Sequence, residues 1–319
     1  RILVNKGSIT NNGVELALNF NPISSEDIEL SFGGNISFNK TEIVNLDSQP
    51  LQGFYENGVM TDRRFYYGNT ISRGAIFRYP ANVFVEGEES SLFYGFKTDG
   101  IYQTNDTDII DGAVPGDVRI VDQLTEDTNG DGILDSGDGL IDEKDRTFLG
   151  NPNPDFVYGF NFDLKYKRWN LSALFNGVYG NDIANGMLLQ LDNAEGRAFA
   201  NITPAAYNNA WRLDNPSNTH PRIGYTTRGQ IAITDRIIED GSYLRLNNLT
   251  IGYDIPVGEK NFIDNLNVYI AGQNLFTWTS YSGYDPEVST FLYTGLITGV
   301  DWNGGVNARN ILLGVNFKF

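Results

Sequence analysis

Residues 308–319, at the end of the chain, read ARNILLGVNFKF. Apolar residues occupy every second position of this stretch up to the last residue: Ile311, Leu313, Val315, Phe317 and Phe319. A period of two residues predicts a β-strand with one apolar face. Because the ends of water-soluble domains commonly fray, two phenylalanines in this position favour a strand that faces lipid. The alternative is an edge strand of a water-soluble β-sandwich.

Three earlier parts of the sequence repeat this alternation, each as a pair of segments joined by a short link. In each pair, large apolar residues occupy one side, and small or polar residues occupy much of the other. Two such runs close together predict an antiparallel hairpin. The paired segments are 14–20 with 30–39, 157–166 with 169–178, and 243–256 with 265–276.

Very long segments rich in Gly, Asn, Asp, Tyr and Pro separate the hairpins. A compact water-soluble domain rarely carries several connections of this length, whereas outer-membrane barrels combine short periplasmic turns with long extracellular loops. With Phe319 at the periplasmic side, all the short links fall on that side. The long segments are 39–91, 98–155, 179–236 and 277–307.

The sequence therefore predicts an all-β fold, an antiparallel transmembrane β-barrel of which residues 1–319 form the C-terminal part. Seven strands are clear, and a pair around 93–102 makes nine. A self-closed eight-stranded barrel is the alternative. Aromatic residues near strand ends predict interfacial girdles. These residues are Tyr166, Trp169, Tyr253, Phe276 and Trp278.

The composition excludes several functional classes. A formal net charge of −17 and a pI near 4.4 argue against a nucleic-acid partner, which requires patches of Lys and Arg. The absence of cysteine excludes disulfides, zinc–thiolate sites and a cysteine nucleophile within these residues. There is no apolar run of about 18 residues, as a transmembrane helix requires. Since no catalytic motif is found either, we expect no enzymatic activity.

An Asp/Gly-rich loop at 117–150 contains a candidate calcium site. Oxygen-bearing residues occupy positions 1, 3, 5, 9 and 12 of a twelve-residue stretch with Gly132 at position 6, as in an EF-hand loop. Position 12 is Asp rather than Glu, and no amphipathic helix flanks the loop. The alternative is a hydrophilic loop without metal. The predicted ligands are Asp127, Asn129, Asp131, the carbonyl of Ile133, Asp135 and Asp138.

The segment 277–307 is a candidate substrate or partner loop because aromatic residues alternate there with Asp, Glu and Asn. Aromatic faces can stack on sugar rings or contact peptides while polar neighbours form hydrogen bonds. The alternative is that these residues pack the loop onto its neighbours. They are Trp278, Tyr281, Tyr284, Phe291, Tyr293 and Trp302.

Several motifs, in order along nearly the whole chain, resemble SusC/RagA-type TonB-dependent transporters of Bacteroidetes. Taken together, these motifs are a far more specific signal than any one alone. One of them is SYLRLNNLTIGYDIP at 242–256, which is similar to the signature near the C-terminus of that family. The others are NGVEL at 12–16, FYGFKTDGIY at 93–102, DTNGDG at 127–132, DRTFLGNPNPDF at 145–156, VYIAGQNLFTWT at 268–279 and YSGYDPE at 281–287.

This resemblance implies an outer-membrane barrel of 22 strands with an N-terminal plug and a TonB box. Because the plug domain, the TonB box and the N-terminal strands are absent from residues 1–319, we expect this chain to be the C-terminal portion of a longer polypeptide. It also implies a SusD-like surface lipoprotein as partner, and oligosaccharide or peptide substrates imported with energy delivered through TonB. A function of another class remains open, that of a β-rich surface protein that binds glycans, is stabilised by calcium and has no transport activity. A glycosidase is the third possibility.

Overall fold

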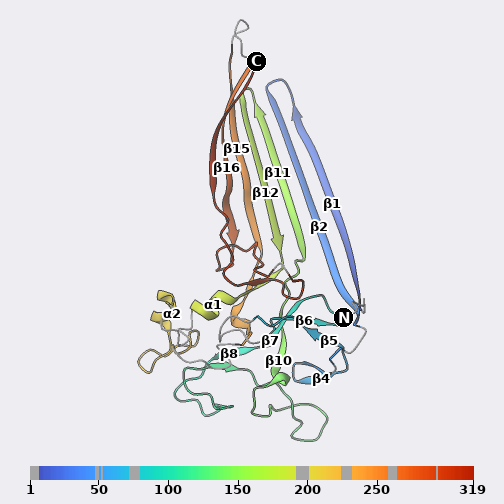
Figure 1. The fold of residues 1–319 in the computed structure, drawn as a ribbon, viewed down its shortest axis with the longest axis vertical. Coiled ribbons are helices and arrows are strands. Elements are labelled where there is room, and N and C mark those ends of the chain that lie inside the picture. The colour runs from blue at the N-terminus through green and yellow to red at the C-terminus, as the bar shows by residue number, and fades with distance from the viewer. Residues whose placement is uncertain are drawn as a thin grey trace, which may run out of the picture.

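The structure is a computed structural model that describes residues 7–46, 50–51, 53–71, 80–191, 201–223, 232–257, 264–291 and 294–319. It has two parts: a tall sheet of long strands, and a body of short elements at one end of that sheet (Figure 1). The described parts of the three long connections, 47–155, 180–242 and 280–309, form the body.

The tall sheet has seven strands, and every neighbouring pair is antiparallel. Its spatial order follows the sequence, and its strands include the three predicted hairpins and the C-terminal segment. The predicted antiparallel β fold is therefore confirmed. The strands are β1 (Gly7–Ser24), β2 (Ile28–Leu46), β11 (Phe156–Tyr166), β12 (Trp169–Tyr179), β15 (Tyr243–Ile255), β16 (Asn265–Thr279) and β18 (Asn310–Lys318).

One face of the sheet is apolar and remains exposed among the described residues. Along β18, Leu313 is 77% exposed, and Leu18 on β1 is 71% exposed. Neighbouring strands contribute rings that pack side by side on this face, such as Phe160 and Phe175 with centroids 4.5 Å apart. A second sheet packed on these side chains, as in a sandwich, would have buried them. An apolar surface of this extent requires lipid or another apolar partner.

The length of the strands matches the thickness of a bilayer. Trp169 and Tyr179 lie at opposite ends of β12 and on the same face. The ten steps between them span about 33 Å, which a strand tilt of about 40° reduces to a height of about 25 Å. That is the height of the lipid-facing band of a barrel. At the end of this band that carries the short turns, the rings of Trp169 and Tyr253 lie 4.8 Å apart, as predicted for an aromatic girdle.

The strand ends that the short links join lie at the end of the sheet where the chain terminates, and the strand ends that the long connections join lie at the opposite end (Figure 1). The link between β11 and β12 consists of Lys167 and Arg168, and Lys167 has a positive φ of 54°. The predicted separation of short turns from long connections is therefore present in the structure.

The body contains small sheets and short helices. Its sheets are β10 (Arg146–Gly150), β7 (Leu92–Phe96), β6 (Asn82–Val85) and β5 (Phe65–Tyr67) in that order; β14 (Ile238–Asp240), β13 (Asp182–Asn185) and β17 (Val300–Asp301); β3 (Phe54–Glu56) with β4 (Val59–Thr61); and β8 (Thr98–Ile101) with β9 (Val118–Ile120). Its helices are η1 (Glu143–Asp145), α1 (Gly186–Leu191), α2 (Pro204–Asn209) and η2 (Asp235–Ile237). None of the helices among the described residues has the length and apolar character needed to cross a membrane.

The predicted extra strand pair around 93–102 belongs to the body and not to the tall sheet. Its residues form β7 and β8, which pair with β6, β10 and β9. All five residues of β7 are buried, so this strand lacks the exposed apolar face of a lipid-facing strand. The prediction of up to nine barrel strands is therefore wrong for this pair, because a continuous apolar run indicates burial on both faces.

All three long connections contribute to one apolar core of the body. Phe93 comes from the first, Ile233 from the second and Val300 from the third, and each is almost fully buried. Backbone and side-chain hydrogen bonds join the connections: Phe96 N donates to Ile233 O at 2.9 Å, and Asn82 Nδ2 donates to Thr298 O at 3.1 Å. The long connections therefore form one folded unit instead of separate loops.

Candidate functional site

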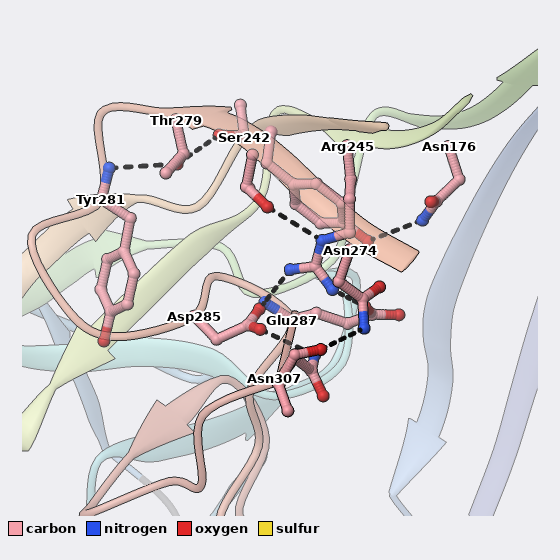
Figure 2. A network of polar contacts seen from close by, with 12 residues as sticks. Asn176, Ser242, Arg245, Asn274, Thr279, Tyr281, Asp285, Glu287 and Asn307 are labelled. Atoms are coloured by element: carbon pink, nitrogen blue, oxygen red, sulfur yellow. Dashed lines mark hydrogen bonds and ion pairs between the residues drawn. The ribbon is translucent and has the colours of Figure 1, made fainter. Parts of the chain in front are cut away.

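The candidate site lies where the connection 280–309 meets the wall formed by the tall sheet, around Arg245 of β15 (Figure 2). Arg245 is only 3% exposed. Its Nη2 lies 2.5 Å from Asp285 Oδ1, and its Nη1 lies 2.8 Å from Glu287 Oε2. Its Nε donates to Thr277 Oγ1 on the neighbouring strand at 3.1 Å. The guanidinium thus joins the wall to the connection through both carboxylates.

Asp285 is the buried partner in this network, since it is 6% exposed, whereas the side chain of Glu287 is about half exposed. Asp285 Oδ1 also accepts a hydrogen bond from the backbone N of Glu287 at 2.9 Å. Its Oδ2 accepts one from Asn307 Nδ2 at 2.7 Å, which ties the far end of the connection to the same carboxylate. Such charge-assisted hydrogen bonds offset the cost of burying the Arg245–Asp285 pair.

Further contacts fix the beginning of the connection. Thr279 Oγ1 donates to the carbonyl of Ser242 at 2.8 Å, and Ser282 Oγ donates to Glu239 Oε1 at 2.7 Å. Tyr281 is buried, and its hydroxyl donates to Asp301 Oδ2 at 2.7 Å. Burial, together with the negative charge of Asp301, raises the pKa of Tyr281. The connection is thus held both to the wall and to the body.

The structure divides the predicted aromatic loop into buried and exposed members. Tyr281, Phe291 and Trp302 are buried, and the last two belong to the core of the body. These three therefore pack the loop onto its neighbours, which was the alternative considered from the sequence. Trp278 and Tyr284 are 52% and 72% exposed, respectively. Tyr293 lies outside the described residues.

Sequence reasoning noted Asp285 and Glu287 only as polar neighbours in the aromatic loop and did not single out Arg245, although the motifs at 242–256 and 281–287 were part of the family resemblance. The available signal was a charged residue between Leu244 and Leu246, in the alternating pattern of β15. This pattern places Arg245 on the polar face of a strand, but it does not indicate which carboxylate lies opposite. Only the fold brings the segment 281–287 against it.

The acidic loop has a local order of its own. Asp127 accepts backbone hydrogen bonds from Gly130, Asp131 and Gly132, and Asp135 Oδ1 accepts from both N and Oγ1 of Thr128. The bond from Gly132 is the largest of the effects that lower the pKa of Asp127. Asp138 forms an ion pair with Lys144 at 2.7 Å.

The remaining predicted calcium ligands, Asn129, Asp131 and Ile133, also lie in this exposed loop. Asn129 Oδ1 accepts from the backbone N of Asp131, and Asp131 Oδ1 accepts from that of Ile133. Across the described ranges, no three acidic or histidine side chains gather closely enough to hold a metal ion. Calcium binding at 127–138 stays a prediction.

The polar face of the tall sheet, opposite to its apolar face, carries a ladder of amides and carboxylates. Asp254 accepts from Asn170 Nδ2 at 3.2 Å and from Asn267 Nδ2 at 2.8 Å, across three adjacent strands. On the same face, Lys165 Nζ lies 4.0 Å from Glu29 Oε1. A concave region whose lining includes Glu29, Lys165, Asn170 and Asn267 runs across the sheet. Such a surface is suited to water and polar partners.

A sheet with one exposed apolar face, one polar concave face and bilayer-length strands is a section of a transmembrane β-barrel. No protein-family model matches the sequence. Similarity to individual proteins is nevertheless extensive. The chain is 31% identical over 322 residues to TonB-dependent receptor P3 of Formosa agariphila and 27% identical over 330 residues to the TonB-dependent receptor SusC of Bacteroides thetaiotaomicron.

Each of these alignments covers 99% of this chain but only 29% and 27%, respectively, of the receptors. The fold is similar to a structure of the RagAB peptide transporter, with a TM-score of 0.69 at 21% identity, over 99% of this chain and 30% of that one. The chain is thus homologous, along nearly its whole length, to part of the SusC/RagA-type TonB-dependent receptors. The resemblance predicted from the sequence motifs is confirmed.

Proposed function

We propose that this chain is the C-terminal part of the barrel of a TonB-dependent importer in the outer membrane. In this proposal, residues 1–319 belong to one barrel domain, the polar face lines the lumen, and the body lies at the extracellular mouth. The importer takes up oligosaccharides or peptides with a SusD-like lipoprotein, and TonB supplies the energy. The single observation that carries this proposal is the two-faced sheet of bilayer-length strands.

Two comparisons support the transport role. The relatives in sequence are named TonB-dependent receptors, and the similar structures are named peptide transporters or importers. The chain spans about 30% of those proteins, so the complete activity requires the rest of the polypeptide. The other candidate, a calcium-stabilised glycan-binding protein without transport activity, is less well supported, because it leaves the exposed apolar face without a role.

Uptake by cells that carry or lack the full-length gene tests the proposal. Two probe sets, fluorescently labelled mixed peptides and fluorescently labelled mixed oligosaccharides, distinguish the substrate classes. We expect deletion to abolish uptake of one set, and dissipation of the proton-motive force to abolish the same uptake in wild-type cells. Unchanged uptake of both sets after deletion contradicts the proposal. Purification of the full-length protein in detergent then shows whether a lipoprotein accompanies it.

A further inference from the structure

Arg309 lies on the apolar face of the tall sheet, beside two exposed aromatic rings. It precedes β18 and alternates in step with Ile311 and Leu313, which belong to that face. Its guanidinium carbon lies 5.9 Å from the ring centroid of Phe276. That ring stacks on Trp278 at 6.1 Å, and both rings are about half exposed. The cation is therefore on the outside of the wall and not in the lumen.

The length of β18 indicates the depth of Arg309. Ten steps separate Arg309 from Phe319, which lies at the end of the sheet that carries the short turns. They span about 33 Å, or a height of about 25 Å at a tilt of about 40°, which equals the height of the apolar band. With Phe319 at one interface of the bilayer, Arg309 lies at the other, next to the long connections. This is the level of lipid headgroups.

The surroundings of Arg309 match the chemistry of a phosphate-bearing amphiphile. In the part of the chain that the structure describes, Arg309 forms no ion pair with a carboxylate, although the whole chain carries a net charge of −17. A guanidinium donates in a planar fork that matches phosphate. From Arg309 toward the C-terminus, Ile311 and Leu313 continue as an apolar surface along which acyl chains can lie.

We propose that Arg309, Phe276 and Trp278 form a binding site for the phosphate of a lipid headgroup in the outer leaflet. Arg309 donates to the phosphate, the two rings lie at the headgroup level, and Ile311 and Leu313 contact the acyl chains. The site rests on the proposed function, because it requires the sheet to be embedded in a bilayer. Aromatic rings commonly occupy this level of a membrane protein.

Native mass spectrometry of the full-length protein in detergent tests the site, with phosphatidic acid or diacylglycerol as the added probe. We expect the wild type to retain phosphatidic acid more strongly than diacylglycerol, which lacks the phosphate. Arg309→Gln should weaken retention of phosphatidic acid about tenfold, as expected when a charge-assisted contact is lost, and leave diacylglycerol unchanged. Arg309→Lys should keep part of the retention of phosphatidic acid.

Lys165→Gln provides the matched control, since it removes the same charge from the polar face. Equal retention of phosphatidic acid by wild type and Arg309→Gln overturns the site, as does an equal loss in Lys165→Gln. A wild type that is dimeric together with an Arg309→Gln variant that is monomeric also overturns the site, because the face then contacts a second copy of the chain. Extraction of the full-length protein without detergent refutes instead the proposed function itself.

Discussion

Replacement of Arg245 by Gln should release the connection 280–309 from the barrel wall. Arg245 and Asp285 are 3% and 6% exposed, so the substitution leaves a buried carboxylate that keeps, among the described residues, Asn307 Nδ2 and the backbone N of Glu287 as donors. Loss of one partner from a buried pair typically costs about 3–5 kcal/mol. Because about 1.4 kcal/mol corresponds to a factor of ten, local opening of the connection should increase by about a hundredfold or more.

Limited proteolysis of the full-length protein in detergent measures this opening, because cleavage within 280–309 reports the population of the open form. The double variant Arg245→Gln with Asp285→Asn should recover much of the protection, since it removes the unpaired buried charge. Arg212→Gln is the control: its pair with Asp214 at 3.7 Å is largely exposed and should contribute less than about 1 kcal/mol. Equal cleavage rates in Arg245→Gln and Arg212→Gln would refute the reasoning.

Three further predictions concern the body. Tyr281→Phe should destabilise the full-length protein by about 1–3 kcal/mol in chemical unfolding, because buried Asp301 loses the donor at 2.7 Å, whereas exposed Tyr284→Phe should change little. Burial raises the pKa of Tyr67 from 10.0 to about 12. The contribution of the Tyr67 hydroxyl to stability is therefore complete below pH 10 and is lost as the pH rises from 10 to 12. Tyr67→Phe should reduce this alkaline loss of stability, measured by chemical unfolding at each pH. If calcium binds at 127–138, chelation should accelerate proteolysis of 117–150 and Asp127→Asn should abolish that response; unchanged cleavage after chelation removes the calcium hypothesis.

The tall sheet could be predicted because its residues follow a simple period. Along β18 and β12, alternation places every second side chain on the apolar face, and the short links limit how the strands can pair. The body could not be predicted in this way. Its strands are short, one of them, β7, is buried on both faces, and its core joins residues such as Phe93 and Val300, which are far apart in sequence.

The candidate site was only partly accessible from the sequence for the same reason. Aromatic composition alone cannot separate a packed ring such as Trp302 from an exposed one such as Tyr284, because both occur among the same polar neighbours. The pairing of Arg245 with Asp285 depends on how 280–309 folds back onto β15, and no local pattern encodes that contact.

The central claim is that adjacent side chains of β18 face lipid and water in turn, and spin labels at Leu312 and Leu313 test it most directly. Both side chains are exposed, at 57% and 77%, and they point to opposite faces. Residues 1–319 contain no cysteine, so one introduced cysteine provides a single attachment point for each label in this part of the protein. In the full-length protein in a bilayer, oxygen should relax the label at 313 more strongly, and a water-soluble nickel chelate the label at 312. Preferential relaxation of both labels by the nickel chelate would contradict the account.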